Sequence, residues 1–230
     1  MLKLGEKSIK SLYLGAKSYA KAYLGEKLVF NKIKKPYYCE VEYIESTGTQ
    51  YIDTGIIGNG EFEVSYKFRK TNADKKNTII AGARSATQHL ILGQITENNK
   101  FTYGYLNNYT TLSSVIIEQN KDYEVKISYK NGSQIVTING VNVASSNWSG
   151  EEKTDLNILL FKRNFYSDND KLNSFIGRIY LCKIIQNGTL VRDFIPCLLN
   201  GEVGMWDKVN KVFYPNAGTG EFLKGKIIEK

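Results

Sequence analysis

The amino-acid sequence predicts an all-β protein, an antiparallel two-sheet jelly-roll sandwich preceded by a small β-meander. Three observations support this prediction. The 230 residues include 16 Tyr and 20 Gly but only 3 Pro, a composition that suits pleated strands joined by tight turns. Apolar and polar residues alternate in many short runs after Pro36, and Asn-Gly dipeptides separate several of these runs. No helix-period stretch of useful length follows Pro36.

An internal repeat occupies the N-terminal segment. The motif Leu-Gly-x-Lys begins at Leu4, Leu14 and Leu24, with a period of ten residues. Ten residues suit a strand and a tight turn at Gly-x-Lys, because glycine permits the positive φ that a hairpin needs. The repeat therefore predicts a three- or four-stranded meander; a helix over residues 7–24 is the alternative, which the regularly spaced glycines disfavour. Such a meander has little core of its own, so we expect it to pack against the main domain, sister copies or a larger assembly.

The run Lys34-Lys35-Pro36 marks the boundary between two domains, residues 1–36 and 37–230. Nine Lys and two Glu before the boundary account for +7 of the net charge of +8. Such a basic segment can contact nucleic acid, an acidic membrane surface or an acidic protein. Because residues 1–36 contain no arginine, we disfavour nucleic acid and favour docking onto other protein subunits. The candidate anchor residues are Tyr13, Lys17, Tyr23 and Lys27.

The second domain is predicted as a series of short strands. Alternation is clean over residues 62–68 and 123–129. Hairpin turns are predicted at Asn131-Gly132, at Asn139-Gly140 and at Asn187-Gly188, the last between the apolar runs 179–185 and 190–195. Shorter apolar runs predict further strands at 78–81, 90–93, 101–105, 113–117 and 156–161. About a dozen short strands of this kind are typical of a sandwich or jelly roll.

The composition also bounds location and redox state. No run of 18 or more apolar residues occurs, so we expect no membrane insertion. The first ten residues carry charges throughout and lack an apolar core, so a secretory signal peptide is not expected. The three cysteines, Cys39, Cys182 and Cys197, fit neither a disulfide scaffold nor a metal-ligand spacing. We predict that they are small buried apolar residues in a reduced compartment.

Catalytic groups are sparse. The carboxylate pairs Glu40/Glu42 and Glu61/Glu63 could share a strand face, but both flank inward-facing apolar residues and are predicted to be solvated. His89, the only histidine, is predicted to lie at a strand edge or on the surface, and no Gly-x-Ser-x-Gly elbow accompanies it. We therefore predict no catalytic residues, no cofactor and no metal, so the protein is expected not to be an enzyme.

Binding is a better candidate than catalysis. Sugar sites on β-sandwiches set an aromatic face against a pyranose and use amide and carboxylate groups on its hydroxyls. The candidates are Tyr103, Tyr105, Tyr109 and Trp148, for which core packing or loop filling is the favoured alternative. The segment Asp168-Asn169-Asp170 could hold calcium, but a polar turn is favoured there.

Three longer segments resemble the concanavalin A-like, laminin-G-like jelly rolls common in bacteriophage and gut-bacterial proteins. They are residues 43–55, the hairpin 129–141, and the stretch from Phe175 through Asp207 to Gly220. The resemblance covers about residues 41–224, and it implies a concanavalin A-like fold. That fold hosts lectins, adhesion modules and hydrolases alike, so it does not fix the function.

The Leu-Gly-x-Lys repeat resembles short repeats that precede such domains in phage virion proteins. Together the two resemblances imply a non-enzymatic structural protein of a bacteriophage, a capsid or tail decoration or fibre assembled in the bacterial host cytoplasm. The expected partners are other virion proteins, sister copies in a homo-oligomer such as a homotrimer, and a host-surface glycan. The alternatives are a bacterial carbohydrate-binding module and, less favoured, a glycoside hydrolase of the same fold.

Overall fold

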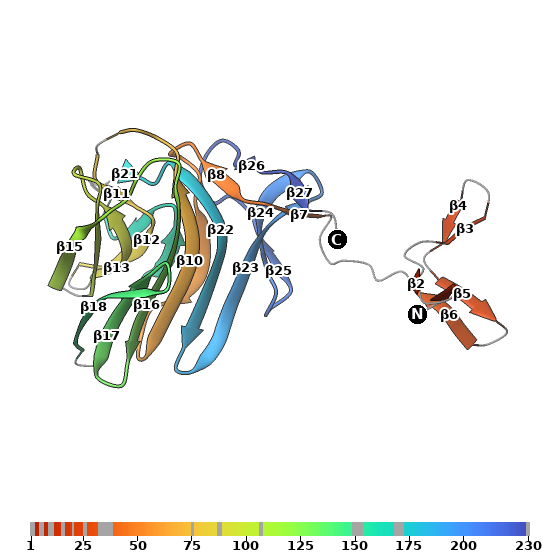
Figure 1. Ribbon diagram of the computed structural model, residues 1–230, viewed down its shortest axis with the longest axis horizontal. Helices are drawn as coiled ribbons and strands as arrows, with labels where there is room; N and C mark the ends of the chain where they lie inside the picture. The colour runs from red at the N-terminus through yellow and green to blue at the C-terminus, as the bar shows by residue number, and fades with distance from the viewer. Residues whose placement is uncertain are drawn as a thin grey trace. The chain divides into compact units, whose positions relative to one another are not determined.

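The computed structural model of the chain describes all residues except 1–2, 5–6, 9–11, 15–16, 20, 25–26, 32–38, 75, 87–88, 106–107, 149–153, 168–172 and 229–230. The chain divides into two compact units, Met1–Pro36 and Tyr37–Lys230. Every regular element in the described residues is a β-strand (Figure 1). None of the described residues belongs to a helix that could cross a membrane.

The first unit consists of short antiparallel hairpins, one for each copy of the repeat. Their strands are β1 (Lys3–Leu4) with β2 (Lys7–Ser8), β3 (Leu12–Leu14) with β4 (Lys17–Tyr19), and β5 (Lys21–Leu24) with β6 (Lys27–Asn31). The register pairs Leu4 with Lys7, Leu14 with Lys17, and Leu24 with Lys27. The first and last residues of each Leu-Gly-x-Lys motif thus pair with each other. In place of one continuous meander, the described residues pair only within a repeat.

One sheet of the second unit has 12 strands, with a central order of β18-β17-β16-β10-β22-β23-β24-β25. Strands β8 and β7 add to β22 and β23, and the C-terminal strands β26 and β27 pair with β8 and β7. The strands of this large sheet are β7 (Cys39–Val41), β8 (Ile44–Ser46), β10 (Phe62–Lys70), β16 (Asp122–Lys130), β17 (Ser133–Ile138), β18 (Val141–Asn147), β22 (Gly177–Gln186), β23 (Thr189–Leu199), β24 (Glu202–Asp207), β25 (Val212–Tyr214), β26 (Leu223–Lys224) and β27 (Ile227–Ile228).

The second layer combines two ladders, β15-β14-β13-β11-β21 and β20-β12-β19-β9. The amide of Ile80 donates to the carbonyl of Gly93 over 2.8 Å and joins them. Two pairings, β11 with β21 and β12 with β20, are parallel, and the remaining ones are antiparallel. The strands are β9 (Ile52–Ile57), β11 (Thr78–Ile79), β12 (Ala81–Arg84), β13 (His89–Ile95), β14 (Lys100–Tyr105), β15 (Asn108–Ile116), β19 (Asn157–Leu160), β20 (Arg163–Phe165) and β21 (Asn173–Ser174).

The core lies between the two sheets, as the stacked layers in Figure 1 show. Burial alternates strictly along β10, where Phe62, Val64, Tyr66 and Phe68 point inward. Since successive side chains on a strand point to opposite faces, Glu63, Ser65, Lys67 and Arg69 lie on the open face of the large sheet. The all-β sandwich predicted from the sequence is confirmed.

The predicted Asn-Gly hairpins are also confirmed. Asn and Gly both have positive φ at 131–132, 139–140 and 187–188, the backbone conformation of the two-residue hairpin turn whose twist matches that of its strands. A fourth pair with the same conformation, Asn200-Gly201, joins β23 to β24.

Candidate functional site

A row of four charged residues crosses the open face of the large sheet on the adjacent strands β8, β22, β10 and β16. The registers place Glu45 opposite Arg178, Arg178 opposite Arg69, and Arg69 opposite Asp122. The signs along this row are minus, plus, plus, minus. Like charges directly opposite each other destabilise a sheet, so the central arginine pair needs compensation.

The flanking carboxylates supply this compensation. Arg178 Nε lies 2.7 Å from Glu45 Oε2, and Arg69 Nε lies 2.5 Å from Asp122 Oδ1. Lys67 Nζ lies 3.2 Å from the other oxygen of Asp122. The side chains of Arg69 and Arg178 remain 30% and 26% exposed, so each guanidinium is held in place yet open to solvent.

Two tyrosines complete the site because a β-bulge turns one of them outward. Phe68 pairs with Ile179 and Lys67 with Leu181, so Tyr180 is the extra, unpaired residue of β22. Its ring meets that of Tyr43, immediately before β8, edge-on at 5.6 Å. We use the term platform for the surface formed by seven residues: Tyr43, Glu45, Lys67, Arg69, Asp122, Arg178 and Tyr180.

Cations surround both platform rings. The Arg178 guanidinium carbon lies 4.1 Å from the Tyr43 ring centroid. Lys67 Nζ and the Arg69 guanidinium carbon lie 4.9 Å and 5.9 Å from the Tyr180 centroid. These distances fall within the range of cation–π attraction, which fixes the long side chains against the rings.

The charges of the platform are set by these contacts. Burial pushes the pKa of the Asp122 carboxyl up, but Arg69 and Lys67 outweigh it and hold that pKa below its usual range. Burial, together with the neighbouring Asp122, raises the pKa of the Tyr180 hydroxyl. Asp122 is therefore ionised at neutral pH, and Tyr180 keeps its proton, which its hydroxyl donates to Asp122.

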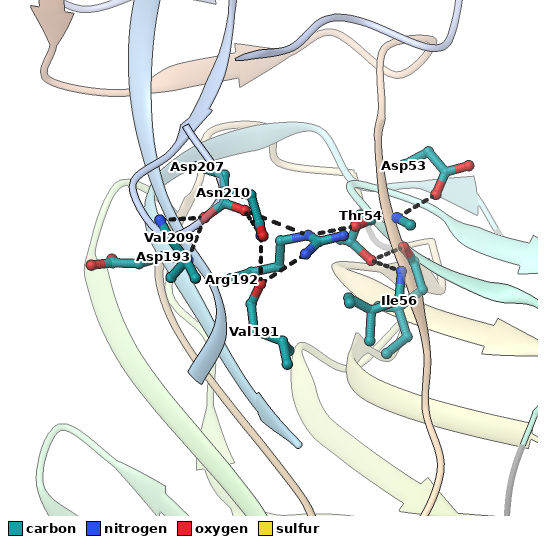
Figure 2. A network of polar contacts seen from close by, with 11 residues as sticks. Asp53, Thr54, Ile56, Val191, Arg192, Asp193, Asp207, Val209 and Asn210 are labelled. Carbon is teal, nitrogen blue, oxygen red and sulfur yellow. Dashed lines mark hydrogen bonds and ion pairs between the residues drawn. The ribbon is translucent and has the colours of Figure 1, made fainter. Parts of the chain in front are cut away.

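A second polar network joins the two sheets at their edge (Figure 2). Arg192 of β23 donates from Nε to the carbonyl of Thr54 on β9 over 2.9 Å and lies 3.8 Å from Asp207 Oδ2. Asp207 is fully buried and accepts from the backbone amides of Asp193 and Val209, each over 3.0 Å. Because Arg192 and both oxygens of Asp207 already bond to groups of the protein itself, we interpret this network as a structural connection between the sheets.

The aromatic residues predicted to bind sugar lie on β14, on β15 and directly after β18. Tyr103 is only 2% exposed and belongs to the core, so its ring is closed to a ligand. Trp148 is partly buried, with its ring 6.0 Å from that of Tyr129. Tyr105 and Tyr109 lie on the paired strands β14 and β15, and their side chains fall outside the described part of the structure. Glycan binding by Tyr105, Tyr109 and Trp148 stays a prediction.

The candidate anchor residues Tyr13, Lys17, Tyr23 and Lys27 lie on β3, β4, β5 and β6. Their side chains, like the whole of Asp168-Asn169-Asp170, are outside the described residues. The anchoring role and the choice between a calcium site and a polar turn therefore stay predictions. Among the residues that the structure describes, no cluster of three or more His, Cys, Asp or Glu could hold a metal ion.

The prediction of solvated carboxylates is correct for Glu42 and wrong for Glu40. Glu40 is only 7% exposed, because β7 is flanked both by β23 and by the returning C-terminal strand β27. Glu42 is exposed, and its carboxylate accepts from the amide of Lys226 over 3.1 Å. Of the other pair, Glu63 lies 2.8 Å from Lys126, as on a solvated sheet face.

His89 opens β13, but it is buried, with 6% of its surface exposed, so the surface position is wrong. Burial, assisted by the charges of Arg84 and Arg163, lowers the pKa of its imidazole to about 4. The three cysteines are buried, as predicted, and each is a free thiol.

Comparison with known proteins supports the fold and does not assign a family. No protein-family model matches the chain, and no curated protein matches it. Several solved structures do match the chain. A putative carbohydrate binding protein from Bacteroides ovatus superposes with a TM-score of 0.59 at 13% identity, over 93% of this chain and 68% of that chain. The native heptameric SAP-like pentraxin from Limulus polyphemus superposes with a TM-score of 0.51 at 9% identity, over 84% of this chain and 97% of that chain.

These likenesses show that the chain has the concanavalin A-like jelly-roll fold. At such low identity they show the fold alone, and neither speaks to the predicted phage origin. The platform is what sequence reasoning missed. Tyr43, Glu45, Arg178 and Tyr180 lie within the segments that carry the family resemblance. Lys67 and Arg69 occupy outward positions of β10, whose alternating run 62–68 was recognised, and Asp122 immediately precedes the alternating run 123–129. That alternation was the available signal for Lys67 and Arg69.

Proposed function

We propose that this chain is a carbohydrate-binding protein and that the platform is its glycan site. The observation that carries the proposal is the pair of half-buried tyrosines set among fixed cations and carboxylates on an open sheet face. Aromatic rings pack against the apolar side of a pyranose, and charged groups bind its hydroxyls. The description of the Bacteroides ovatus protein as a putative carbohydrate binding protein agrees with this proposal.

Binding without turnover is the expected behaviour. Glycoside hydrolysis needs a carboxylic acid that keeps its proton near neutral pH beside a second free carboxylate. Both platform carboxylates are instead bound to arginines, and the pKa of Asp122 is lowered. Incubation with β-glucans should release no sugar; release that disappears in Asp122→Asn would revive the hydrolase alternative.

The test is binding of the full chain to an array of glycans, followed by titration calorimetry on those that bind. Tyr180→Ala should weaken binding about tenfold, since an aromatic contact of roughly 1.4 kcal/mol corresponds to that factor. Tyr166→Ala is the matched control, because Tyr166 is 54% exposed and follows β20 in the other sheet. Equal losses in both variants, or no binding to any glycan, would contradict the proposal.

We further propose that residues 1–36 attach the jelly roll to a larger particle, as in a bacteriophage virion assembled in the bacterial host cytoplasm. The supporting observation is the Leu–Lys pairing repeated in each N-terminal hairpin, which forms ladders too small to be stable alone. Light scattering of the full chain should show an oligomer that Leu14→Asp with Leu24→Asp dissociates. If the unmodified chain and the double variant are both monomers, packing between sister copies is contradicted. Absence of the labelled protein from intact bacteriophage particles would refute virion attachment.

A further inference from the structure

We infer that the platform selects acidic sugars, with the anionic group of the glycan bound between Arg69 and Arg178. This inference rests on the proposed function and adds the class of ligand. It begins from the register, which places these two arginines directly opposite each other on β10 and β22. Nothing in sheet geometry requires this arrangement, and like charges so placed repel.

The flanking carboxylates compensate each arginine from its outer side. Glu45 approaches Arg178 from β8, and Asp122 approaches Arg69 from β16. An anion between the two guanidiniums would supply compensation on the inner side. The platform holds three cations, Lys67, Arg69 and Arg178, and two carboxylates, and the exposed Glu124 lies opposite Lys67 in the register. An anion is therefore attracted to the arginine pair, where two positive charges lie opposite each other.

The donor geometry fits a carboxylate or a sulfate ester. Each guanidinium binds its carboxylate through Nε, and Arg178 also bonds to the Tyr180 hydroxyl. A guanidinium has five N–H groups, so both arginines retain donors for an anion. Guanidinium forks match planar or multi-oxygen anions and form charge-assisted hydrogen bonds of the stronger kind. The Tyr180 hydroxyl, bonded to both Asp122 and Arg178, links the two ion pairs and helps to hold the arginines in place.

The site is also organised before the ligand arrives. Ion pairs of 2.5 and 2.7 Å and the cation–π contacts restrict the arginine side chains, which lowers the entropy lost on binding. The adjacent tyrosines favour a sugar that carries the anion over a free inorganic ion, because the rings offer apolar area to a pyranose.

The experiment compares acidic and neutral forms of one polymer. The full chain is titrated with polygalacturonate, with its methyl ester, and with dextran sulfate against dextran, at 50 and 500 mM salt. We expect at least one acidic form to bind about tenfold or more tightly than its neutral partner, and to weaken as salt rises. Preference for the uronate pair or for the sulfate pair distinguishes the two anion chemistries.

Substitutions then locate the site. Arg69→Gln and Arg178→Gln should each weaken binding about tenfold or more, and Arg178→Lys should recover only part of the loss because lysine lacks the fork. Lys183→Gln is the matched control. Lys183 is exposed on the same strand β22, and this substitution removes one positive charge outside the row of four charged residues. Unchanged denaturation midpoints confirm that the variants fold.

Each outcome decides between the two proposals. Equal binding of acidic and neutral forms overturns the acidic preference and leaves glycan binding standing. Losses as large in Lys183→Gln as in Arg178→Gln, or equal affinity for DNA, would indicate a general polyanion surface and overturn the inference. Failure of every acidic polymer overturns it as well, and failure on the full glycan array removes the proposed function with it.

Discussion

Removing the Asp207 carboxylate should destabilise the second unit more than almost any other single polar change. Asp207 is fully buried, its Oδ1 accepts two backbone amides, and Arg192 beside it is only 14% exposed (Figure 2). Asp207→Ala leaves the amide of Asp193 without its acceptor and a mostly buried guanidinium without its carboxylate. An orphaned donor costs about 1–3 kcal/mol and a broken buried ion pair about 3–5, so the overlapping losses come to roughly 4 kcal/mol.

Urea denaturation of the full chain measures this loss. Both tryptophans, Trp148 and Trp206, lie in the second unit, so their fluorescence reports its unfolding alone. We expect the free energy of unfolding to fall by about 4 kcal/mol at unchanged m-value, with a fall in Tm of roughly 8–16 °C. Asp207→Asn, which retains an acceptor oxygen, should lose about half as much.

Lys208→Ala is the control for this series. Lys208 is 43% exposed and contacts Asp193 across 3.0 Å, so its loss should cost under about 1 kcal/mol. A loss in Asp207→Ala no larger than that of the control would refute the assignment of the network as a structural connection. An Asp207→Asn variant as unstable as Asp207→Ala would also refute it, because the acceptor oxygen that Asn retains should preserve part of the free energy of unfolding.

Three further predictions test the core. Gly93 has a φ of +143°, and a Cβ there would lie 2.1 Å from the Tyr66 hydroxyl oxygen, so Gly93→Ala should lower the free energy of unfolding by about 2–4 kcal/mol in the same urea assay. The pKa of His89 is about 4 in the folded chain, below its ordinary value. The unfolded chain therefore binds the extra proton, and the free energy of unfolding should fall as pH drops from about 6.5 to 4. The C2–H resonance of this single histidine should titrate near 4, and a midpoint near 6.5 would contradict the buried position. Burial raises the pKa of Cys182, and that of Cys197 to about 12, so both thiols should resist a disulfide reagent at pH 8 until urea unfolds the chain; fast labelling of the native protein would contradict this.

Local sequence patterns were sufficient where the structure depends on near neighbours. The alternation of β10 assigned its inward and outward faces, because period two is a property of the strand itself. Asn-Gly placed the hairpins, because both residues tolerate the positive φ that such turns need. The same reasoning failed at Glu40, where burial comes from a strand near the other end of the chain.

In the platform, too, local pattern predicts some features and strand pairing sets the others. Lys67 and Arg69 could be assigned to the open face from the alternation of their own strand, but the residue opposite Arg69 could not be predicted in this way. Arg178 comes opposite it only through the β10–β22 register, and Tyr180 joins the site only through a bulge in that ladder. A bulge shifts every later side chain of a strand by one residue, and no local pattern in the sequence marked its position.

The fold class, the turns and the faces of the long strands could be predicted from sequence, because they follow from backbone preference and period-two burial within a few residues. Which charges meet could not, since strand order and register are set by packing of the whole core. The row of Glu45, Arg178, Arg69 and Asp122 exists only because four strands from distant parts of the chain lie side by side.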